Sequence, residues 1–131
     1  MQSLINLYTQ SQYKEALNKA SQLLQQYPNS INLYNIIGAA NNGLGKLKEA
    51  IKAYDKALAI KPDYVEVYNN MGLVLQEQGK LKEAIEAYDK ALAIKPDFAD
   101  AYNNMGIILQ EQGKLEQAKE AYKKTLTLKP E

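Results

Sequence analysis

Pairs of acidic residues are the first side chains in this sequence whose spacing could support chemistry. Glu83 and Glu86 are three residues apart, and Glu116 and Glu120 are four apart, so each pair would lie on one face of a helix. Acid–base catalysis needs two carboxyl groups that converge in a pocket, whereas these acids stand beside lysines in the pattern of a solvated helix face. The chain also has no Cys and no His, which removes the thiolate nucleophile, the usual general base and the commonest metal ligands. We therefore expect no enzymatic activity, no metal and no cofactor.

The stretch "GLGKL" at 43–47 is a second candidate, because glycine and lysine together can form a phosphate-binding loop. Such loops follow a β-strand, and no strand pattern precedes this one. Its Gly45–Lys46 pair recurs as Gly79–Lys80 and as Gly113–Lys114. We interpret all three as turns between helices, in which a glycine takes the left-handed conformation that ends a helix.

The elements that position these residues repeat along the whole chain. The four prolines, Pro28, Pro62, Pro96 and Pro130, follow one another at intervals of 34 residues, and "AYDKALAIKPD" occurs at both 53–63 and 87–97. A fixed period of this length is typical of a solenoid, in which each unit buries its apolar face against its neighbours. Apolar residues at helical spacing, with a glycine between the two runs of each unit, predict helices over 1–10, 13–26, 31–44, 47–60, 65–78, 81–94, 99–112 and 115–128.

One repeat carries a recognisable motif: Tyr68, Met71, Gly72, Leu75, Ala84, Tyr88 and Pro96. With these spacings the chain resembles the tetratricopeptide repeat family. The resemblance implies an all-α fold, a right-handed superhelix of helix–turn–helix units with about three and a half to four repeats. It would form a single domain over 1–131, with a partial repeat at 1–30 and full repeats at 31–64, 65–98 and 99–131.

Two kinds of position depart from simple packing. Gly72 and Ala84 are small where the two helices of a unit are expected to cross, so larger side chains would force the helices apart. Asn41 stands where later units have Leu75 and Leu109. A buried amide there would need a backbone partner, or the end of that helix would fray.

The resemblance implies that first helices line a concave groove. These helices contain four acids, Glu66, Glu77, Asp100 and Glu111, and no lysine, which disfavours nucleic acid as a partner. The predicted groove residues are Asn35, Glu66, Asn69, Asn70, Leu73, Gln76, Glu77, Asp100, Asn103, Asn104, Ile107, Gln110 and Glu111. The tandem asparagines among them are poor helix formers. Their amides could bind a peptide backbone, or they could bridge or cap neighbouring helices.

These observations predict a protein-interaction scaffold that binds an extended peptide segment of a partner in its groove. The alternative is a substrate-recruiting arm cut from a larger enzyme, such as a glycosyltransferase or a sulfotransferase. Chaperone adaptors of the family hold an acidic C-terminus with lysines and asparagines, and only Asn70 of the corresponding residues here matches. Asp100, with no lysine near it in the pattern, would repel such a tail, so we expect neutral or basic partners.

Two further expectations concern surroundings and assembly. No apolar run approaches the roughly 20 residues of a membrane span, so we expect no membrane partner. The absence of Cys is compatible with a reducing compartment, and we expect a cytoplasmic protein. The face of helix 115–128 that would receive another unit carries Tyr122, Leu126 and Leu128. Exposed apolar surface of this kind favours self-association through the terminal helices.

Overall fold

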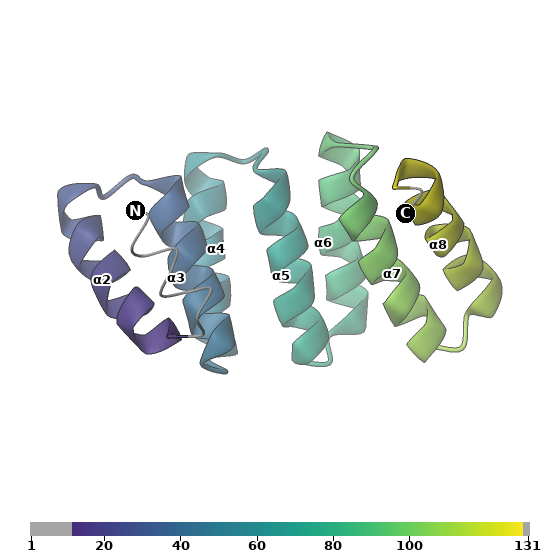
Figure 1. Ribbon diagram of the computed structural model, residues 1–131, viewed down its shortest axis with the longest axis horizontal. Coiled ribbons are helices and arrows are strands. Elements are labelled where there is room, and N and C mark those ends of the chain that lie inside the picture. Colours follow the sequence, from purple (N-terminus) through teal and green to yellow (C-terminus); the bar gives the residue numbers. More distant parts are fainter. Residues whose placement is uncertain (1–11, 130–131) are drawn as a thin grey trace. The chain divides into compact units, whose positions relative to one another are not determined.

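The computed structural model describes residues 12–129, and within them it contains seven α-helices and no strand (Figure 1). The helices are α2 (Tyr13–Gln26), α3 (Ile31–Gly43), α4 (Leu47–Ile60), α5 (Val65–Glu77), α6 (Leu81–Ile94), α7 (Ala99–Glu111) and α8 (Leu115–Leu128). The all-α prediction is confirmed, and every one of these helices starts at its expected residue. The helix expected at 1–10 lies outside the described residues.

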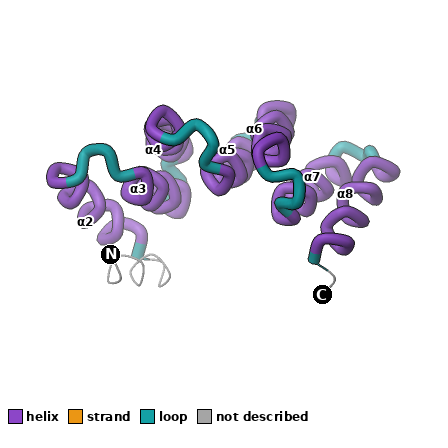
Figure 2. Tube along the Cα trace, turned by 90° about the horizontal axis from the view of Figure 1, so that it is seen from above, coloured by secondary structure: helices purple, strands orange, loops and turns teal. Residues whose placement is uncertain are grey.

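The turns between α3 and α4, between α5 and α6, and between α7 and α8 each contain a glycine in the left-handed conformation. Gly45, Gly79 and Gly113 have φ angles of 76°, 78° and 77°, which other residues rarely adopt. In the turn after α5, the N–H of Lys80 donates to the carbonyl of Leu75 over 2.9 Å. Such a bond satisfies a carbonyl that the end of the helix leaves without an intrahelical partner. The resulting connections are short (Figure 2), and the predicted inter-helix turns are confirmed.

The chain divides into two compact units, one ending at Val67 and the other beginning at Tyr68, so that the boundary falls inside α5. In the first unit, α3 packs against both α2 and α4. A hydrophobic core cluster in this unit consists of Ala16, Ala20 and Leu33, which are all buried. Small residues on α2 therefore let α3 approach closely.

The second unit contains α6, α7 and α8 together with most of α5. Here α7 packs against both α6 and α8, and Leu109, Ala118 and Ala121 form a buried cluster. A Cβ atom added to Gly72 would lie 2.4 Å from the Tyr88 ring, which is far inside van der Waals contact. Glycine occurs at this position in the first helix of a repeat because the tyrosine ring of the next helix occupies the space that a side chain would need.

Asn41 is buried, with 5% of its surface exposed. Helix α3 continues past Asn41 to Gly43. The end of the helix is therefore not frayed, which was one of the two alternatives for this position. Gly43 itself lies beside the ring of Tyr13, 2.6 Å from where its Cβ would be. The end of α3 is therefore held against α2.

Candidate functional site

The second unit contains a groove between α5 and α7 with a volume of about 330 Å³. Its lining residues are Leu73, Gln76 and Glu77 from α5, and Asn104, Ile107 and Glu111 from α7. Leu73 is three residues before Gln76 and four before Glu77, and Asn104, Ile107 and Glu111 follow one another at intervals of three and four, so each set lies on one side of its helix. All six are among the residues that the sequence predicts for a groove.

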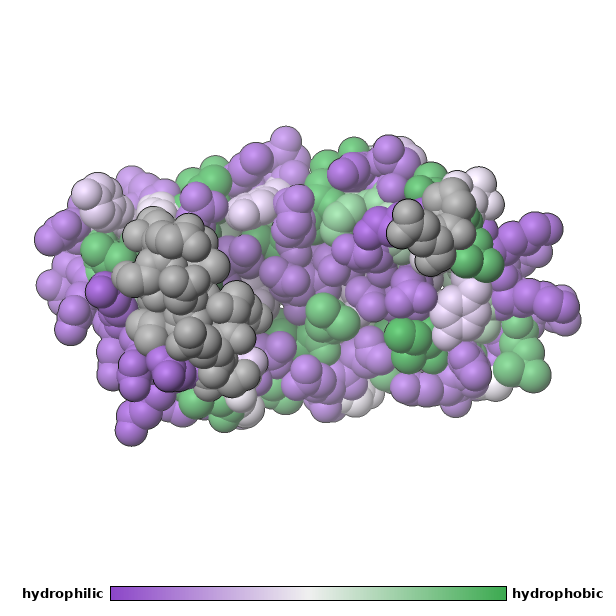
Figure 3. All heavy atoms as spheres, viewed as in Figure 1, coloured by the Kyte–Doolittle hydropathy of each residue, from purple (hydrophilic) through white to green (hydrophobic). Residues whose placement is uncertain are grey.

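The groove is lined by both apolar and acidic side chains. Leu73 and Ile107 expose 36% and 37% of their surface, although aliphatic side chains are more stable when buried. The face over α5 and α7 is otherwise mainly hydrophilic, and small hydrophobic patches interrupt it (Figure 3). Glu77 and Glu111 lie one helical turn beyond the aliphatic side chains and are exposed. The described lining thus combines two aliphatic contacts with two carboxylates and contains no lysine.

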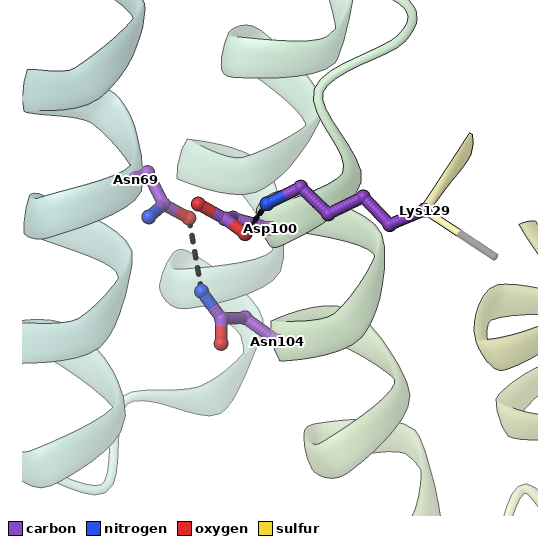
Figure 4. Close-up of polar contacts among 4 residues, drawn as sticks. All are labelled: Asn69, Asp100, Asn104 and Lys129. Atoms are coloured by element: carbon purple, nitrogen blue, oxygen red, sulfur yellow. Dashed lines mark hydrogen bonds and ion pairs between the residues drawn. The ribbon is translucent and has the colours of Figure 1, made fainter. Parts of the chain in front are cut away.

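An amide pair joins the two helices that form the groove. Asn104 on α7 donates from Nδ2 to Oδ1 of Asn69 on α5 over 2.9 Å (Figure 4). Asn69 is buried, at 9% exposure, and Asn104 is half-buried. The two residues are 35 positions apart, one more than the repeat period, so the first asparagine of one repeat accepts from the second asparagine of the next. Asn69 therefore bridges helices, as the sequence allowed.

The bridge leaves Asn104 with capacity for a ligand. A carboxamide has two N–H donors and one acceptor oxygen, and the contact with Asn69 uses one donor. The oxygen of Asn104 points away from Asn69 (Figure 4). Because Asn104 also lines the groove, bridging and ligand binding are compatible at this residue.

The expectation that no lysine lies near Asp100 is wrong. Lys129, just after α8, places its Nζ 3.1 Å from Oδ1 of Asp100 (Figure 4). Both side chains are largely exposed, at 65% for Lys129 and 56% for Asp100, so the pair stabilises the fold by about 1 kcal/mol or less. The pairing does reduce the negative charge that Asp100 presents. Among the residues that line the groove, Glu77 and Glu111 are the charged ones.

Two tyrosine hydroxyls contact first-helix glutamines, which the sequence analysis did not anticipate. Tyr88 donates to Oε1 of Gln76 over 3.3 Å, and Tyr122 donates to Oε1 of Gln110 over 2.9 Å. In both cases glutamine precedes tyrosine by 12 residues. The signal in the sequence was a tyrosine, rather than a phenylalanine, at a packing position, because a buried hydroxyl usually has a partner.

The other predicted groove residues have more varied surroundings. Asn35 on α3 is half-buried and Glu66 in the first turn of α5 is exposed, and both belong to the first unit. In the second unit, Asn70 is half-buried, whereas Asn103 and Gln110 are exposed. None of these five lines the groove between α5 and α7.

The acidic pairs lie on exposed helix faces, as expected. Glu83, Glu86, Glu116 and Glu120 are all exposed. Partial burial, and secondarily the carboxylate of Glu86, raises the pKa of Asp89 above its usual value. Across residues 12–129, no three acidic side chains are grouped so as to hold a metal ion. In the same range, no helix has both the length and the apolar character needed to cross a membrane.

Family models match almost the entire chain. The model described as "TPR repeat" matches residues 42–79 and 74–113. Models described as "Tetratricopeptide repeat" match residues 99–131 and 1–30. No curated protein matches the chain significantly.

Solved structures share this fold over nearly the full chain. A crystal structure of MamA is 28% identical, with a TM-score of 0.87, and the match covers 97% of this chain and 74% of MamA. PilF of Pseudomonas aeruginosa is 25% identical, with a TM-score of 0.89, over 98% of this chain and 59% of PilF. YrrB, described as a TPR protein with an unusual peptide-binding site, is 23% identical, with a TM-score of 0.81, over 95% of this chain and 64% of YrrB. At that identity, YrrB is similar to this chain in fold alone.

Proposed function

Because the chain belongs to the tetratricopeptide repeat family, whose proteins act as interaction scaffolds, we propose that it binds an extended peptide segment of a partner protein. The binding surface is the groove between α5 and α7. The scaffold acts by holding its partner and not by catalysis. The partner segment is neutral or basic.

The observation that carries this proposal is the composition of the groove lining. Leu73 and Ile107 remain more than a third exposed, which leaves apolar area that an apolar peptide side chain would remove from water. Gln76 and Asn104 lie beside them in the same groove. Their amides can pair with the peptide groups of an extended chain without reading its side chains.

Charge sets the preference among segments. Glu77 and Glu111 line the groove, and their carboxylates attract a lysine or arginine that flanks the apolar side chain. Asp100 contributes less because Lys129 pairs with it. Since the two glutamates are exposed, their attraction is screened by salt, and the preference for basic segments should weaken as ionic strength rises.

Two blocked peptides test the proposal: acetyl-Lys-Leu-Ala-Leu-Lys-amide and its acidic counterpart with Glu in place of Lys. Binding to the full chain is measured by isothermal titration calorimetry at low and at moderate salt. We expect the basic peptide to bind at least about fivefold more tightly, which corresponds to roughly 1 kcal/mol. Replacing both groove acids (Glu77→Gln with Glu111→Gln) should remove most of that difference.

A matched control separates local charge from net charge. Glu83 and Glu116 are exposed acids on α6 and α8 and do not line the groove. The double variant Glu83→Gln with Glu116→Gln changes the net charge by the same amount and should leave the preference intact. Equal binding of both peptides, or an equal effect of the two double variants, would refute the proposal.

A further inference from the structure

Second-helix tyrosines reach across to the groove side of the first helices. Tyr88 of α6 is completely buried, yet its hydroxyl contacts Gln76, which lines the groove. The contact of Tyr122 with Gln110 repeats the arrangement on α8 and α7. Packing alone does not require it, since phenylalanine would fill nearly the same space.

A glycine opens the path for each ring. Gly72 lies one helical turn before Gln76 on α5, and therefore on the same face. The Tyr88 ring lies across Gly72 so closely that a Cβ there would be 2.4 Å from Cε1 and 2.6 Å from Cζ. A side chain at position 72 would occupy the space through which the hydroxyl reaches Gln76. Gly106 gives the same access to Tyr122, with a closest ring atom at 2.7 Å.

The hydroxyl of Tyr88 acts as a donor to the glutamine. Burial raises the pKa of Tyr88 well above its ordinary value, so the hydroxyl stays protonated. Its donation to Oε1 holds that oxygen toward α6, and the amide group is planar. The two N–H donors on Nε2 are then directed away from the tyrosine, and Gln76 lines the groove.

We propose that Tyr88 is a positioning residue, which holds Gln76 so that its Nε2 donates to a main-chain carbonyl of the bound peptide. Tyr122 makes the corresponding bond to Gln110 one repeat later, but Gln110 does not line the groove, so the proposal concerns Gln76 alone. This inference rests on the proposed function and specifies its chemistry. Gln76 supplies the donor and the oxygen of Asn104 supplies an acceptor, which matches the C=O and N–H groups of an extended chain. An amide fixed before binding loses less freedom when the peptide arrives.

The preceding repeat has an asparagine where the later repeats have this glutamine. The residue 12 positions before Tyr54 is Asn42, which is one methylene shorter. Its Oδ1 is buried and has no hydrogen-bond partner. A tyrosine at this spacing therefore does not hold an asparagine oxygen as it holds Gln76.

The first test uses the free protein, so that it does not depend on any ligand. Side-chain ¹⁵N relaxation of Gln76 Nε2 is compared between the wild-type chain and Tyr88→Phe, which removes only the hydroxyl. We expect an ordered amide in the wild type and a clear loss of order in the variant. Tyr34→Phe is the control, because the Tyr34 hydroxyl bonds to the carbonyl of Pro28 instead. It should leave Gln76 unchanged.

The second test measures affinity for acetyl-Lys-Leu-Ala-Leu-Lys-amide. Gln76→Met, which keeps length but removes the amide, should weaken binding about fivefold, as expected for one lost hydrogen bond. Tyr88→Phe should weaken it about threefold. In the Gln76→Met background, Tyr88→Phe should have no further effect, because there is no amide left to position.

The outcomes separate this inference from the proposed function. The positioning role would be overturned if the Gln76 amide were equally ordered with and without the Tyr88 hydroxyl. It would also be overturned if the losses of affinity from Gln76→Met and Tyr88→Phe multiplied in the double variant. In either case, peptide binding by the wild type would stand. A wild-type chain that does not bind the peptide would refute the proposed function and with it the donor role of Gln76. The inference is supported if the Gln76 amide loses order in Tyr88→Phe and the affinity losses of the two substitutions do not multiply.

Discussion

Replacing Gly72 with alanine should destabilise the protein, although alanine is the better helix former. The added Cβ would lie 2.4, 2.6 and 2.8 Å from three ring carbons of Tyr88. Carbon atoms that are not bonded normally approach to about 3.5 Å, so the ring or the helix must move by roughly an ångström. The ring cannot turn away freely, because Tyr88 is fully buried. The strain must therefore separate α5 from α6.

The size of the effect follows from two opposing terms. Forcing extra volume into a packed site costs about 1–3 kcal/mol. Replacing glycine within a helix returns about 1 kcal/mol. Because these contacts are far inside van der Waals distance, the cost at this site lies in the upper part of that range, at about 2–3 kcal/mol, and we expect a net loss of about 1–2 kcal/mol for Gly72→Ala. Gly106→Ala should cost less, because the closest Tyr122 ring atoms are 2.7 to 3.0 Å away and that tyrosine is only half-buried.

Urea denaturation followed by circular dichroism at 222 nm would measure these differences. A Tyr88→Leu background provides the decisive control. Without the ring, Gly72→Ala should become neutral or stabilising, since only the gain in helix propensity remains. The reasoning is refuted if Gly72→Ala is as stable as the wild type. It is equally refuted if the loss persists unchanged in the Tyr88→Leu background.

Three further predictions concern other positions. Asn41→Leu should raise the melting temperature, because it replaces a buried amide with the residue that later repeats carry; a lower melting temperature by calorimetry would show that the amide has a stabilising partner. Asp89→Asn should be more stable than the wild type at pH 7, because the raised pKa of Asp89 means that its ionisation costs the folded state more than the unfolded state. This advantage should shrink as pH falls through the raised pKa of folded Asp89 and should vanish below the ordinary aspartate pKa of 3.8, where the side chain is protonated in both states; denaturation curves with the same gap at pH 3 and pH 7 would contradict it. Leu126 is 61% exposed on α8, so the wild type should self-associate at high concentration and Leu126→Glu should reduce this; light scattering without concentration dependence would contradict it.

Helix positions were predictable because the sequence marks both ends of each helix. Pro62 and Pro96 follow the ends of α4 and α6, and Gly45 and Gly79 provide the left-handed turns within repeats. These signals act locally and do not depend on tertiary contacts. The expected and observed helix ends consequently differ by at most one residue, as at α3, which was expected to reach residue 44 and ends at Gly43.

Six of the thirteen residues predicted for the groove line the pocket between α5 and α7, but the contacts of these residues could not be predicted. Helical spacing alone places Leu73 and Glu77 on one face. The bond from Asn104 to Asn69 requires knowing how two first helices are offset along their axes, and a periodic pattern does not determine that offset. The Lys129–Asp100 pair joins residues 29 positions apart across a turn and a whole helix. Contacts of this kind depend on packing between helices.

The offset of one residue in the asparagine bond has an evolutionary consequence. In the second unit, Asn69 of one repeat accepts from Asn104, the second asparagine of the repeat that follows. A gene segment that encodes 34 residues with both asparagines therefore encodes an acceptor for the following repeat and a donor for the preceding repeat. In-frame duplication would create a new copy whose polar contacts are already complementary to both neighbours. Lengthening the array in this way needs no compensating mutation, whereas the repeat with Ile36 in place of the second asparagine has no amide donor at that position.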